Sequence, residues 1–467
     1  MNTVTRLLAG MLPAMALGAC SLAPKYVAPA PPVPASWPTG DAYLAQSEAA
    51  LPAVSYKDIF RDPRLQSLVE QALANNRDLR VAAANVAAAR AQVRVTRADQ
   101  FPEIGVTGSA SRTEVKGSGD SSSYSAQGGV SAFELDLFGK LANATAAQRN
   151  TALGTEAAAR TVRLGLVADL ALAWSTYGAD LDLLAIAEAT ATNAQDSVRL
   201  NQARLKGGVA PRTDVRQAEQ VLETARGDLA TQKTALAQDI NAIRLLVGAD
   251  FDTGLLPGSI AQVNEGFAAL PAGTSSQVLL RRPDVVEAEY DLRAANADIG
   301  VARAQLFPSI SLTGLLGFAS NSLSSLFTGG AFAATGGADA SWSIFNAGGK
   351  AAAVEVAKAQ RDAALATYEK AIQTAFSEVA DALADQGTLA ERLRSASAFT
   401  SAAQDTATLT EATYRRGITS SLDNLDAQRS LYTARQAEIS VRLQQASNRV
   451  TLYRVLGGDQ ATTQAGQ

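Results

Sequence analysis

The sequence contains the same pattern twice, at an offset of about 206 residues. Residues 97–102 read Arg-Ala-Asp-Gln-Phe-Pro, and residues 303–308 read Arg-Ala-Gln-Leu-Phe-Pro. Further on, Leu-Val-Gly at 246–248 matches Val-Leu-Gly at 455–457, at an offset of about 209. A duplicated sequence is expected to build one structural unit twice. Because the residue before a proline is pushed out of the helical region, a helix should stop at each Phe-Pro.

The residues after each Phe-Pro have the alternation of a β-hairpin. From Ile104 to Ser111, apolar or small residues alternate with polar ones, a period of two that is typical of a strand. A Gly/Ser-rich break at 117–123 precedes a second alternating run at 124–138. In the second half we expect a run from Ile310 to Phe318, a flexible stretch through Gly337 and a returning strand near 338–345. The chain therefore offers two hairpins, or four strands.

Two very long helical stretches follow the hairpins. Residues 142–206 and 350–416 contain no proline and are rich in alanine, which favours helix at nearly every position. Helices of about 65 residues would each be about 100 Å long. Each stretch ends at a glycine, after which a second helix returns antiparallel to the first. The glycines are Gly207, Gly208 and Gly417, and the returning helices are expected at 211–246 and 421–456.

The long stretches carry an apolar stripe at spacings of three and four residues, which is the pattern of heptad packing. In the first stretch the stripe is Val167, Leu170, Trp174, Tyr177, Leu181 and Leu184. In the second it is Phe376, Val379, Leu383, Gln386, Ala390 and Leu393. We therefore interpret Trp174, Tyr177 and Phe376 as core residues.

The N-terminus is typical of a lipoprotein signal peptide. A short apolar run follows Arg6 and ends in Leu-Gly-Ala before the single cysteine, Cys20. Cleavage before Cys20 would leave a cysteine that carries covalent lipid, and Ser21 after it indicates delivery to the outer membrane. The alternative is an ordinary signal peptide with a chance cysteine. The proline-rich residues 23–38 should form an extended tether.

The composition argues against an enzyme. The chain has no histidine and one cysteine, which excludes a Ser-His-Asp triad, a Cys-His pair and a His/Cys zinc site. We therefore assign no catalytic residue, no metal and no cofactor apart from the lipid on Cys20. The formal net charge of -4 is small and mixed along the chain, so no nucleic-acid partner is indicated.

The predicted strands suit a membrane protein. No stretch after the signal peptide has about 18 uninterrupted apolar residues, so a membrane-spanning part would have to be built from strands. Four strands cannot close a barrel, and an open strand edge is not stable in lipid, so the chain must combine its strands with copies of itself. Three copies would supply twelve strands, with the long helices continuing as a hollow cylinder. The fold class is thus an α+β membrane protein with a trimeric barrel and an α-helical tunnel.

The expected organisation has six parts. They are a signal peptide at 1–19, a lipidated tether at 20–60, a first repeat at 61–248, an equatorial connector at 249–282, a second repeat at 283–457 and a flexible tail at 458–467. The first repeat is expected to contain a helix, a β-hairpin at 101–138 and a long helical hairpin at 140–248. The second is expected to contain a helix, a β-hairpin at 307–346 and a long helical hairpin at 349–457.

The sequence resembles the outer-membrane factors of tripartite efflux pumps, of the TolC and OprM type, in the NodT-like lipoprotein branch. The resemblance covers essentially the whole chain and is carried by four stretches: Leu17 to Tyr26, Leu279 to Val285, Thr413 to Gly417 and Leu425 to Arg429. It implies a homotrimer in outer-membrane lipid, which docks on a periplasmic adaptor and an inner-membrane transporter of the RND type. Such a channel releases drugs and other small toxic compounds and contributes to multidrug resistance.

The resemblance also implies a constriction at the periplasmic end of the tunnel. It places Leu422 and Asp426 there, with Asp423 one turn before Asp426 and Asp214 equivalent to Asp423 in the first repeat. A ring of three aspartates would attract cations and narrow the pore. Tyr414 matches a tyrosine that ties neighbouring helices together in relatives, whereas Thr419 stands where some relatives have an arginine. Asp214 and Asp423 could equally be acidic residues favoured in the first turn of any helix.

Two other functions are compatible with parts of the sequence. A lipid-anchored coiled-coil spacer would need the helices but not the membrane-length hairpins. An envelope hydrolase using carboxylates would need paired acids, for which the sequence has no recognisable pattern. A small soluble sheet beside a solid helical bundle is the corresponding alternative for the fold.

Overall fold

The computed structural model describes residues 21–38, 40–43, 55–115, 119–268 and 276–458. The predictions for the signal peptide, for Cys20 and for residues 459–467 lie outside this part of the chain. The chain divides into two compact units, which are described separately. The first contains the residues up to Pro31 with Ala84–Ala157 and Val286–Ala371, and the second contains Pro32–Ala83, Ala158–Val285 and the residues from Ile372 onward.

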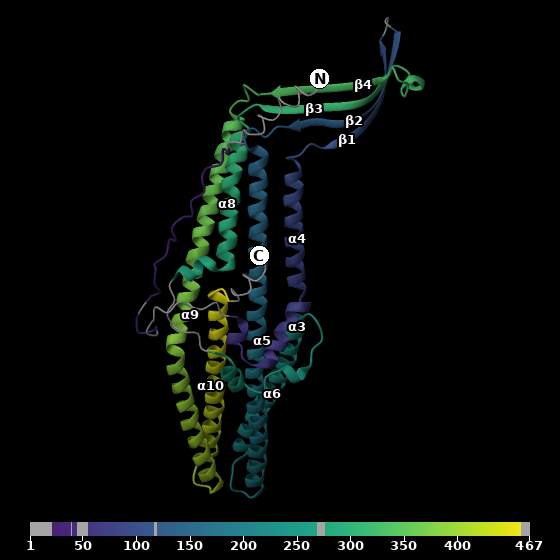
Figure 1. Cartoon of the computed structure of the whole chain (residues 1–467). Coiled ribbons are helices and arrows are strands. Elements are labelled where there is room, and N and C mark those ends of the chain that lie inside the picture. The colour runs from purple at the N-terminus through teal and green to yellow at the C-terminus, as the bar shows by residue number, and fades with distance from the viewer. Residues whose placement is uncertain (1–20, 39, 44–54, 116–118, 269–275, 459–467) are drawn as a thin grey trace. The chain divides into compact units, whose positions relative to one another are not determined.

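The first unit contains one antiparallel sheet of four strands in the order β1-β2-β3-β4 (Figure 1). The strands are β1 (Ile104–Val115), β2 (Gly119–Glu134), β3 (Ser309–Ser320) and β4 (Phe332–Ser341). Both predicted hairpins are present, and they join through β2 and β3, where Tyr124 lies opposite Ser320. Strands far apart in the sequence therefore form one continuous sheet whose outer strands are β1 and β4.

Large apolar side chains remain exposed on and beside the outer strands. On β1 the exposed fractions of Ile104 and Val106 are 78% and 85%. After β4, those of Ile344 and Phe345 are 85% and 87%. Exposed apolar surface of this extent usually marks a contact with another protein or with a membrane.

Two strand positions differ from the sequence-based prediction. β2 begins at Gly119 instead of 124 and ends at Glu134, because the pairing with β1, such as Thr113 with Ser121, draws the serines into the ladder. β4 occupies 332–341 instead of 338–345, so the stretch before Gly337 that we expected to be flexible is strand paired with β3. In both places backbone hydrogen bonds decide the structure, although glycine and serine are poor strand formers.

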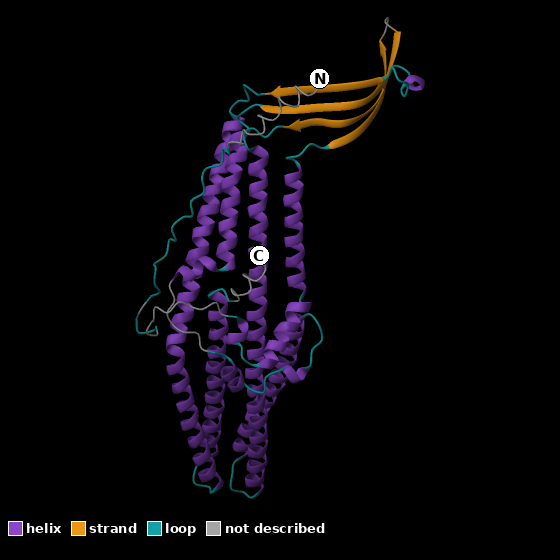
Figure 2. Ribbon diagram, viewed as in Figure 1, coloured by secondary structure: helices purple, strands orange, loops and turns teal. Residues whose placement is uncertain are grey.

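The helices follow the same order in each half of the chain. They are drawn purple in Figure 2. A 22-residue helix precedes each hairpin: α4 (Arg77–Ala98) and α8 (Pro283–Ala304). A 67-residue helix follows each hairpin: α5 (Lys140–Lys206) and α9 (Gly349–Arg415). The returning helices are α6 (Arg212–Val247) and α10 (Ser421–Val455). The long helices lie within two residues of their predicted bounds.

The second unit has its core along α5 and α9. In α5, Val167, Leu170 and Trp174 are buried, as predicted, and the stripe then continues through alanines such as Ala187. In α9 the buried stripe is Ile372, Ala375, Val379, Ala382 and Leu389. Phe376 is half-buried and Ala390 is exposed, so the predicted second stripe is displaced by about one residue at these positions. Small residues at the core positions let neighbouring helices approach closely.

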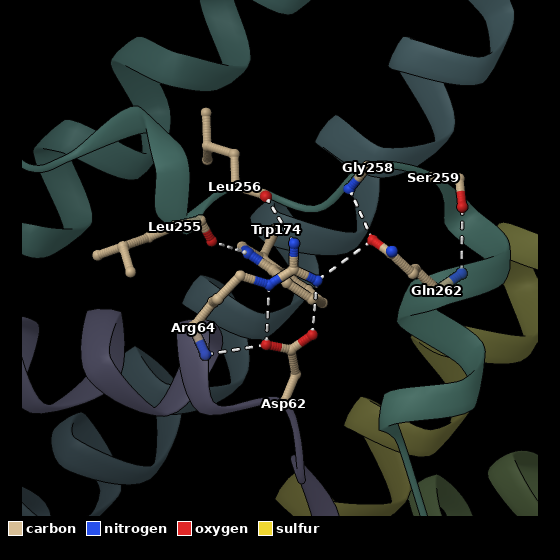
Figure 3. A network of polar contacts seen from close by, with 8 residues as sticks. All are labelled: Asp62, Arg64, Trp174, Leu255, Leu256, Gly258, Ser259 and Gln262. Carbon is tan, nitrogen blue, oxygen red and sulfur yellow. Dashed lines mark hydrogen bonds and ion pairs between the residues drawn. The ribbon is translucent and has the colours of Figure 1, made fainter.

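The described residues of the connector between the halves belong to the second unit. The connector contains η2 (Thr253–Leu255), α7 (Ile260–Gly266) and η3 (Ser276–Arg281), and the short helices α2 (Tyr56–Ile59) and α3 (Pro63–Asn75) belong to the same unit. Trp174 of α5 donates a hydrogen bond of 3.0 Å to the carbonyl of Leu255 (Figure 3). Arg64 of α3 pairs with Asp62 at 2.7 Å and donates to the Leu256 carbonyl and to Gln262 (Figure 3). Within the described residues, no helix is long and apolar enough to cross a membrane.

Candidate pore constriction at the helix tips

Two tight turns close the helical hairpins in the second unit. Gly208 and Gly417 have φ values of +74° and +76°, which glycine adopts without strain. Pro211 then occupies the N-cap of α6, and Ser420 occupies the N-cap of α10. The predicted glycine stops are therefore real, and they place Asp214 and Asp423 in the first turns of the returning helices.

Tyr414 joins the ends of α9 and α5. Its hydroxyl donates a hydrogen bond of 2.7 Å to Oδ1 of Asn201, and Arg204 donates a bond of 2.6 Å to the Tyr414 carbonyl. The Arg204 guanidinium also lies 4.2 Å from the centre of the tyrosine ring, within the range of a cation–π interaction. Tyr414 is 3% exposed and Asn201 is 1% exposed. The two long helices are thus held together at their tips by buried polar contacts.

Asn201 and Arg204 were not among the residues that we predicted for this site. Asn201 continues a seven-residue spacing of buried positions on α5 that runs through Ala187 and Ala194. A polar residue in a core heptad position generally has a specific partner. That spacing is the signal that could have identified it.

Asp423 is engaged in capping its own helix. Its backbone N–H donates to Ser420 Oγ at 3.1 Å, and the Ser420 hydroxyl donates to Asp423 Oδ2 at 2.7 Å. These bonds satisfy a free amide of the first turn and place negative charge at the positive end of the helix dipole. Asp214 is half-buried in the first turn of α6.

Asp426 and Leu422 lie on the exposed side of α10. Asp426 is 3.7 Å from Arg429, one turn further on, and both side chains are more than half exposed. An exposed pair of this kind contributes little to stability. Leu422 is 59% exposed. Neither side chain is buried in the core of its own chain. Their assignment to a pore constriction therefore remains a prediction about the trimer.

Thr419 bonds within its own turn. Its hydroxyl donates to the Thr413 hydroxyl at 2.6 Å, across the loop between α9 and α10. Thr419 therefore links the two arms of one hairpin in this chain. The tie to the other hairpin is carried instead by Tyr414, Asn201 and Arg204.

A groove of about 410 Å³ lies between α6 and α10, with α5 at its base. Leu422, Leu425 and Val221 supply apolar lining, and Arg429 and Asp228 supply charge. Tyr432 crosses the groove and donates a hydrogen bond of 3.1 Å to Asp228. Burial, together with the nearby Asp228 carboxylate, raises the pKa of Tyr432 to about 12, so the hydroxyl stays protonated and remains a donor.

Arg282, in the stretch that carries the family resemblance, is the centre of a buried ion cluster. It is 7% exposed and donates to Asp284 at 2.7 Å, to Glu378 at 2.8 Å and to the Val455 carbonyl at 3.0 Å. Arg281 beside it is exposed. Arg282 is therefore a structural salt-bridge element, whereas among the described residues the structure gives Arg281 no such role.

The fold and these tips can be compared with known proteins. Residues 68–249 and 274–458 match the family model of the outer membrane efflux protein. The chain belongs to this family. As a member of the outer membrane efflux protein family, it is an outer-membrane channel component of an efflux system, as the sequence predicted.

Individual relatives match over nearly their full lengths. The antibiotic efflux pump outer membrane protein ArpC of Pseudomonas putida is 44% identical over 469 residues, which cover 97% of this chain and 96% of ArpC. The cation efflux system protein CusC of Escherichia coli strain K12 is 38% identical over 456 residues, which cover 95% of this chain and 97% of CusC.

Solved structures of this family have the same fold. A crystal structure of CusC matches with a TM-score of 0.84 at 38% identity, covering 94% of this chain and 100% of that one. The open state of the MtrE outer membrane channel of Neisseria gonorrhoeae matches with a TM-score of 0.83 at 32% identity, covering 94% of this chain and 98% of MtrE. The mostly helical chain with one sheet is thus the fold of outer-membrane efflux channels.

Proposed function

We propose that three copies of this chain form a passive export duct with a twelve-stranded barrel and a helical tunnel. The observation that carries this proposal is the open four-stranded sheet, whose outer strands β1 and β4 have exposed apolar side chains. Strands of this length suit a membrane barrel, and a barrel stable in lipid must have no open edge. β1 and β4 run antiparallel in the sheet order, so β4 of one copy can pair with β1 of the next.

The two halves of the chain would each contribute one hairpin and one pair of long helices. The recurrence of helix, hairpin, 67-residue helix and returning helix supports a tandem duplication. In a trimer the tips of the helical hairpins would form a ring. Leu422, Asp423, Asp426 and Asp214 would lie at or near its narrowest point, with Tyr414 holding the ring closed.

The duct would work with an inner-membrane RND-type transporter and a periplasmic adaptor, since a passive channel has no energy source of its own. The relatives named above serve antibiotic and cation efflux, respectively. Because the antibiotic efflux relative is the more similar of the two, we propose drugs or other small organic toxicants as the exported compounds. Covalent lipid on Cys20 would anchor each copy beside the barrel.

Planar-bilayer recording on the detergent-purified lipoprotein tests this proposal, with the mass of the protein in detergent measured on the same sample. A trimer with stepwise, cation-preferring openings is the expected result. A monomer or dimer without current would contradict it and favour the lipid-anchored spacer. A silent trimer that conducts after the hydroxyl bond to Asn201 is removed by Tyr414→Phe would support a duct held closed at its tips.

Substrate and lipidation are tested separately. In a strain that lacks the chain, sensitivity to organic antibiotics should rise several-fold and return to normal with the intact gene, whereas tolerance of metal cations should not change. Radiolabelled palmitate should enter the wild-type protein but not Cys20→Ala. A rise in metal sensitivity alone would overturn the proposed substrate class.

A further inference from the structure

The proline-rich residues that we expected to be a simple tether are docked on the helices over most of their described length. We call residues 21–38 and 40–43 the N-terminal strap. The strap has no helix or strand, yet both of its parts have specific partners, each within its own unit. A free tether would not have such partners.

In the first unit, the strap backbone is held by side chains of α8. Asn296 donates a hydrogen bond of 2.8 Å to the Pro24 carbonyl, and Arg303 donates one of 2.9 Å to the Leu22 carbonyl. Ser21, the first described residue, donates to Asn143 of α5 at 2.9 Å. Three bonds therefore fix the strap within a few residues of Cys20.

Tyr26 adds a side-chain anchor in the same unit. Its hydroxyl donates to Glu289 at 3.1 Å, and Arg293, which pairs with Glu289 at 2.7 Å, lies 4.9 Å from the centre of the tyrosine ring. Burial raises the pKa of Tyr26 to about 12, so the hydroxyl remains a donor throughout the physiological range.

Gly300 of α8 provides the space in which the strap lies. A Cβ atom at this position would be 2.8 Å from both the backbone nitrogen and the Cβ of Ala23 and 2.5 Å from Asn143 Nδ2. The eighteenth residue of α4, which corresponds to Gly300 in α8, is the exposed Arg94. The helix that contacts the strap, α8, thus has glycine at this position. Its counterpart in the first half, α4, has a long charged residue there.

In the second unit, the strap is seated on α9. Trp37 is 2% exposed and stacks on Phe376 with ring centres 5.0 Å apart, and the Ser276 amide donates to the Ala35 carbonyl at 3.2 Å. A Cβ atom at Gly387 of α9 would overlap the backbone of Ala42.

Gly387 of α9 has a counterpart in α5, which supports the docking of the strap on α9. It is the thirty-ninth residue of α9, and the thirty-ninth residue of α5 is Gly178. A Cβ atom at Gly178 would be 3.2 Å from the Ser259 carbonyl, in the connector segment of Figure 3. The strap therefore occupies on α9 the place that the connector occupies on α5.

We propose that the docked strap is a positioning element, which fixes where the lipid-bearing N-terminus leaves the protein, beside the start of α5. Consecutive Cα atoms are about 3.8 Å apart, so Cys20 cannot be further than that from the Cα of Ser21. If the strap were free, its 23 residues could extend to about 75 Å, and the lipid could lie anywhere within that distance of Tyr43. This inference rests on the proposed lipidation of Cys20.

Trypsin provides the test, because Lys25 is exposed and is the sole lysine or arginine between Ser21 and Tyr56. Cleavage after Lys25 in the full-length protein requires the strap to leave α8. We expect the double variant Asn296→Ala/Arg303→Ala to be cut at Lys25 at least ten times faster than the wild type. Gly300→Val should have a similar effect by filling the space.

The first half of the chain supplies matched controls. Arg90 and Arg97 occupy in α4 the positions that Asn296 and Arg303 occupy in α8, so Arg90→Ala/Arg97→Ala should leave cleavage at Lys25 unchanged. Arg94→Val is the control for Gly300→Val. If trypsin cut Asn296→Ala/Arg303→Ala at Lys25 at the wild-type rate, the inference that the strap docks on α8 would be overturned.

The positioning role is measured in cells. The double variant should reach the outer membrane as assembled channel in several-fold lower yield, with unchanged current from each channel that does assemble. Fast cleavage with normal yield would overturn the positioning role while leaving docking intact. Failure of palmitate labelling would refute lipidation, whereas protection of Lys25 would still be observed, so the two failures are distinguishable.

Discussion

The Tyr414 hydroxyl donates a 2.7 Å hydrogen bond to the Asn201 side chain, and this buried bond links the tips of the two 67-residue helices. Asn201 also donates to the Ser197 carbonyl at 2.9 Å, so both ends of its amide are satisfied. Buried polar groups that lose their partner carry the full cost of desolvation. The contact therefore holds the tips only as long as both residues are in place.

Replacing Tyr414 with phenylalanine should loosen the tips. The substitution leaves Asn201 Oδ1 without its donor, at a cost of about 1–3 kcal/mol. In planar bilayers we expect openings to become more frequent at unchanged ion preference. Tyr368→Phe, a buried tyrosine of α9 whose hydroxyl has no hydrogen bond to any described residue, is the control and should behave as wild type. Equal opening in the two variants would mean that the bond does not restrain the tips.

Asp423 and Asp426 should differ in what they control. Asp426→Asn removes an exposed charge with little structural role, so we expect reduced cation preference and raised conductance with no change in thermal stability. Asp423→Asn weakens the cap of α10, so its main effect should be a loss of about 1 kcal/mol of stability. Reversal potentials in a salt gradient and thermal unfolding separate the two. Wild-type selectivity in Asp426→Asn would remove this residue from the constriction.

The stability of the α5–α6 pair should decrease as pH rises. Asp239 of α6 and Asp180 of α5 form a carboxyl pair, and burial, followed by the charge of Asp180, raises the pKa of Asp239 to about 7. Because the pKa is raised on folding, the native state binds the extra proton, and the stabilisation present at low pH is lost as pH rises towards 7. Asp239→Asn should therefore unfold at a higher temperature than wild type at pH 8, with a smaller difference at pH 5.

The control for this titration is Asp169→Asn, which changes an exposed aspartate on α5. Its melting temperature should follow that of the wild type at both pH values. A difference between Asp239→Asn and wild type that does not vary with pH would show that the pair does not titrate in this range.

Arg282 and Arg281 are adjacent but should respond very differently to alanine. Arg282→Ala removes three partners at once, so we expect a loss of about 3 kcal/mol, at the lower end for a buried pair because Asp284 and Glu378 are 40% and 43% exposed. Arg281→Ala should change stability by about 0.5 kcal/mol or less. Denaturant titration of helical circular dichroism measures both. Similar losses in the two variants would contradict the assigned cluster.

The helices and the order of the elements could be predicted because their signals are local. Alanine-rich sequence without proline defines α5 and α9, and Phe-Pro and glycine mark where helices end. β4 was placed too late because residues 332–337 are strand only through pairing with β3, a contact that composition does not report. The buried stripe on α9 differs from its predicted positions for the same reason, because the burial of its residues depends on which helices pack beside α9.

The candidate site was predicted in part. Tyr414, Asp423 and Asp426 lie at one helical hairpin, as the resemblance implied. The partner of Tyr414, Asn201, was not predicted; the heptad spacing on α5 carries that amide into the core. The contacts of the strap with the helices involve residues more than 120 positions apart, such as Tyr26 and Glu289, and local patterns carry no information about them.

The equal lengths of α5 and α9 restrict how the helical part of such a channel could become longer or shorter. Deleting one residue from α5 alone would rotate Asn201 by about 100° about the helix axis and withdraw it by about 1.5 Å from Tyr414. Deleting seven residues from both helices would rotate each tip by only about 20°. Natural or engineered variants that span a wider or narrower periplasm should therefore differ by whole heptads, gained or lost in both halves of the gene together.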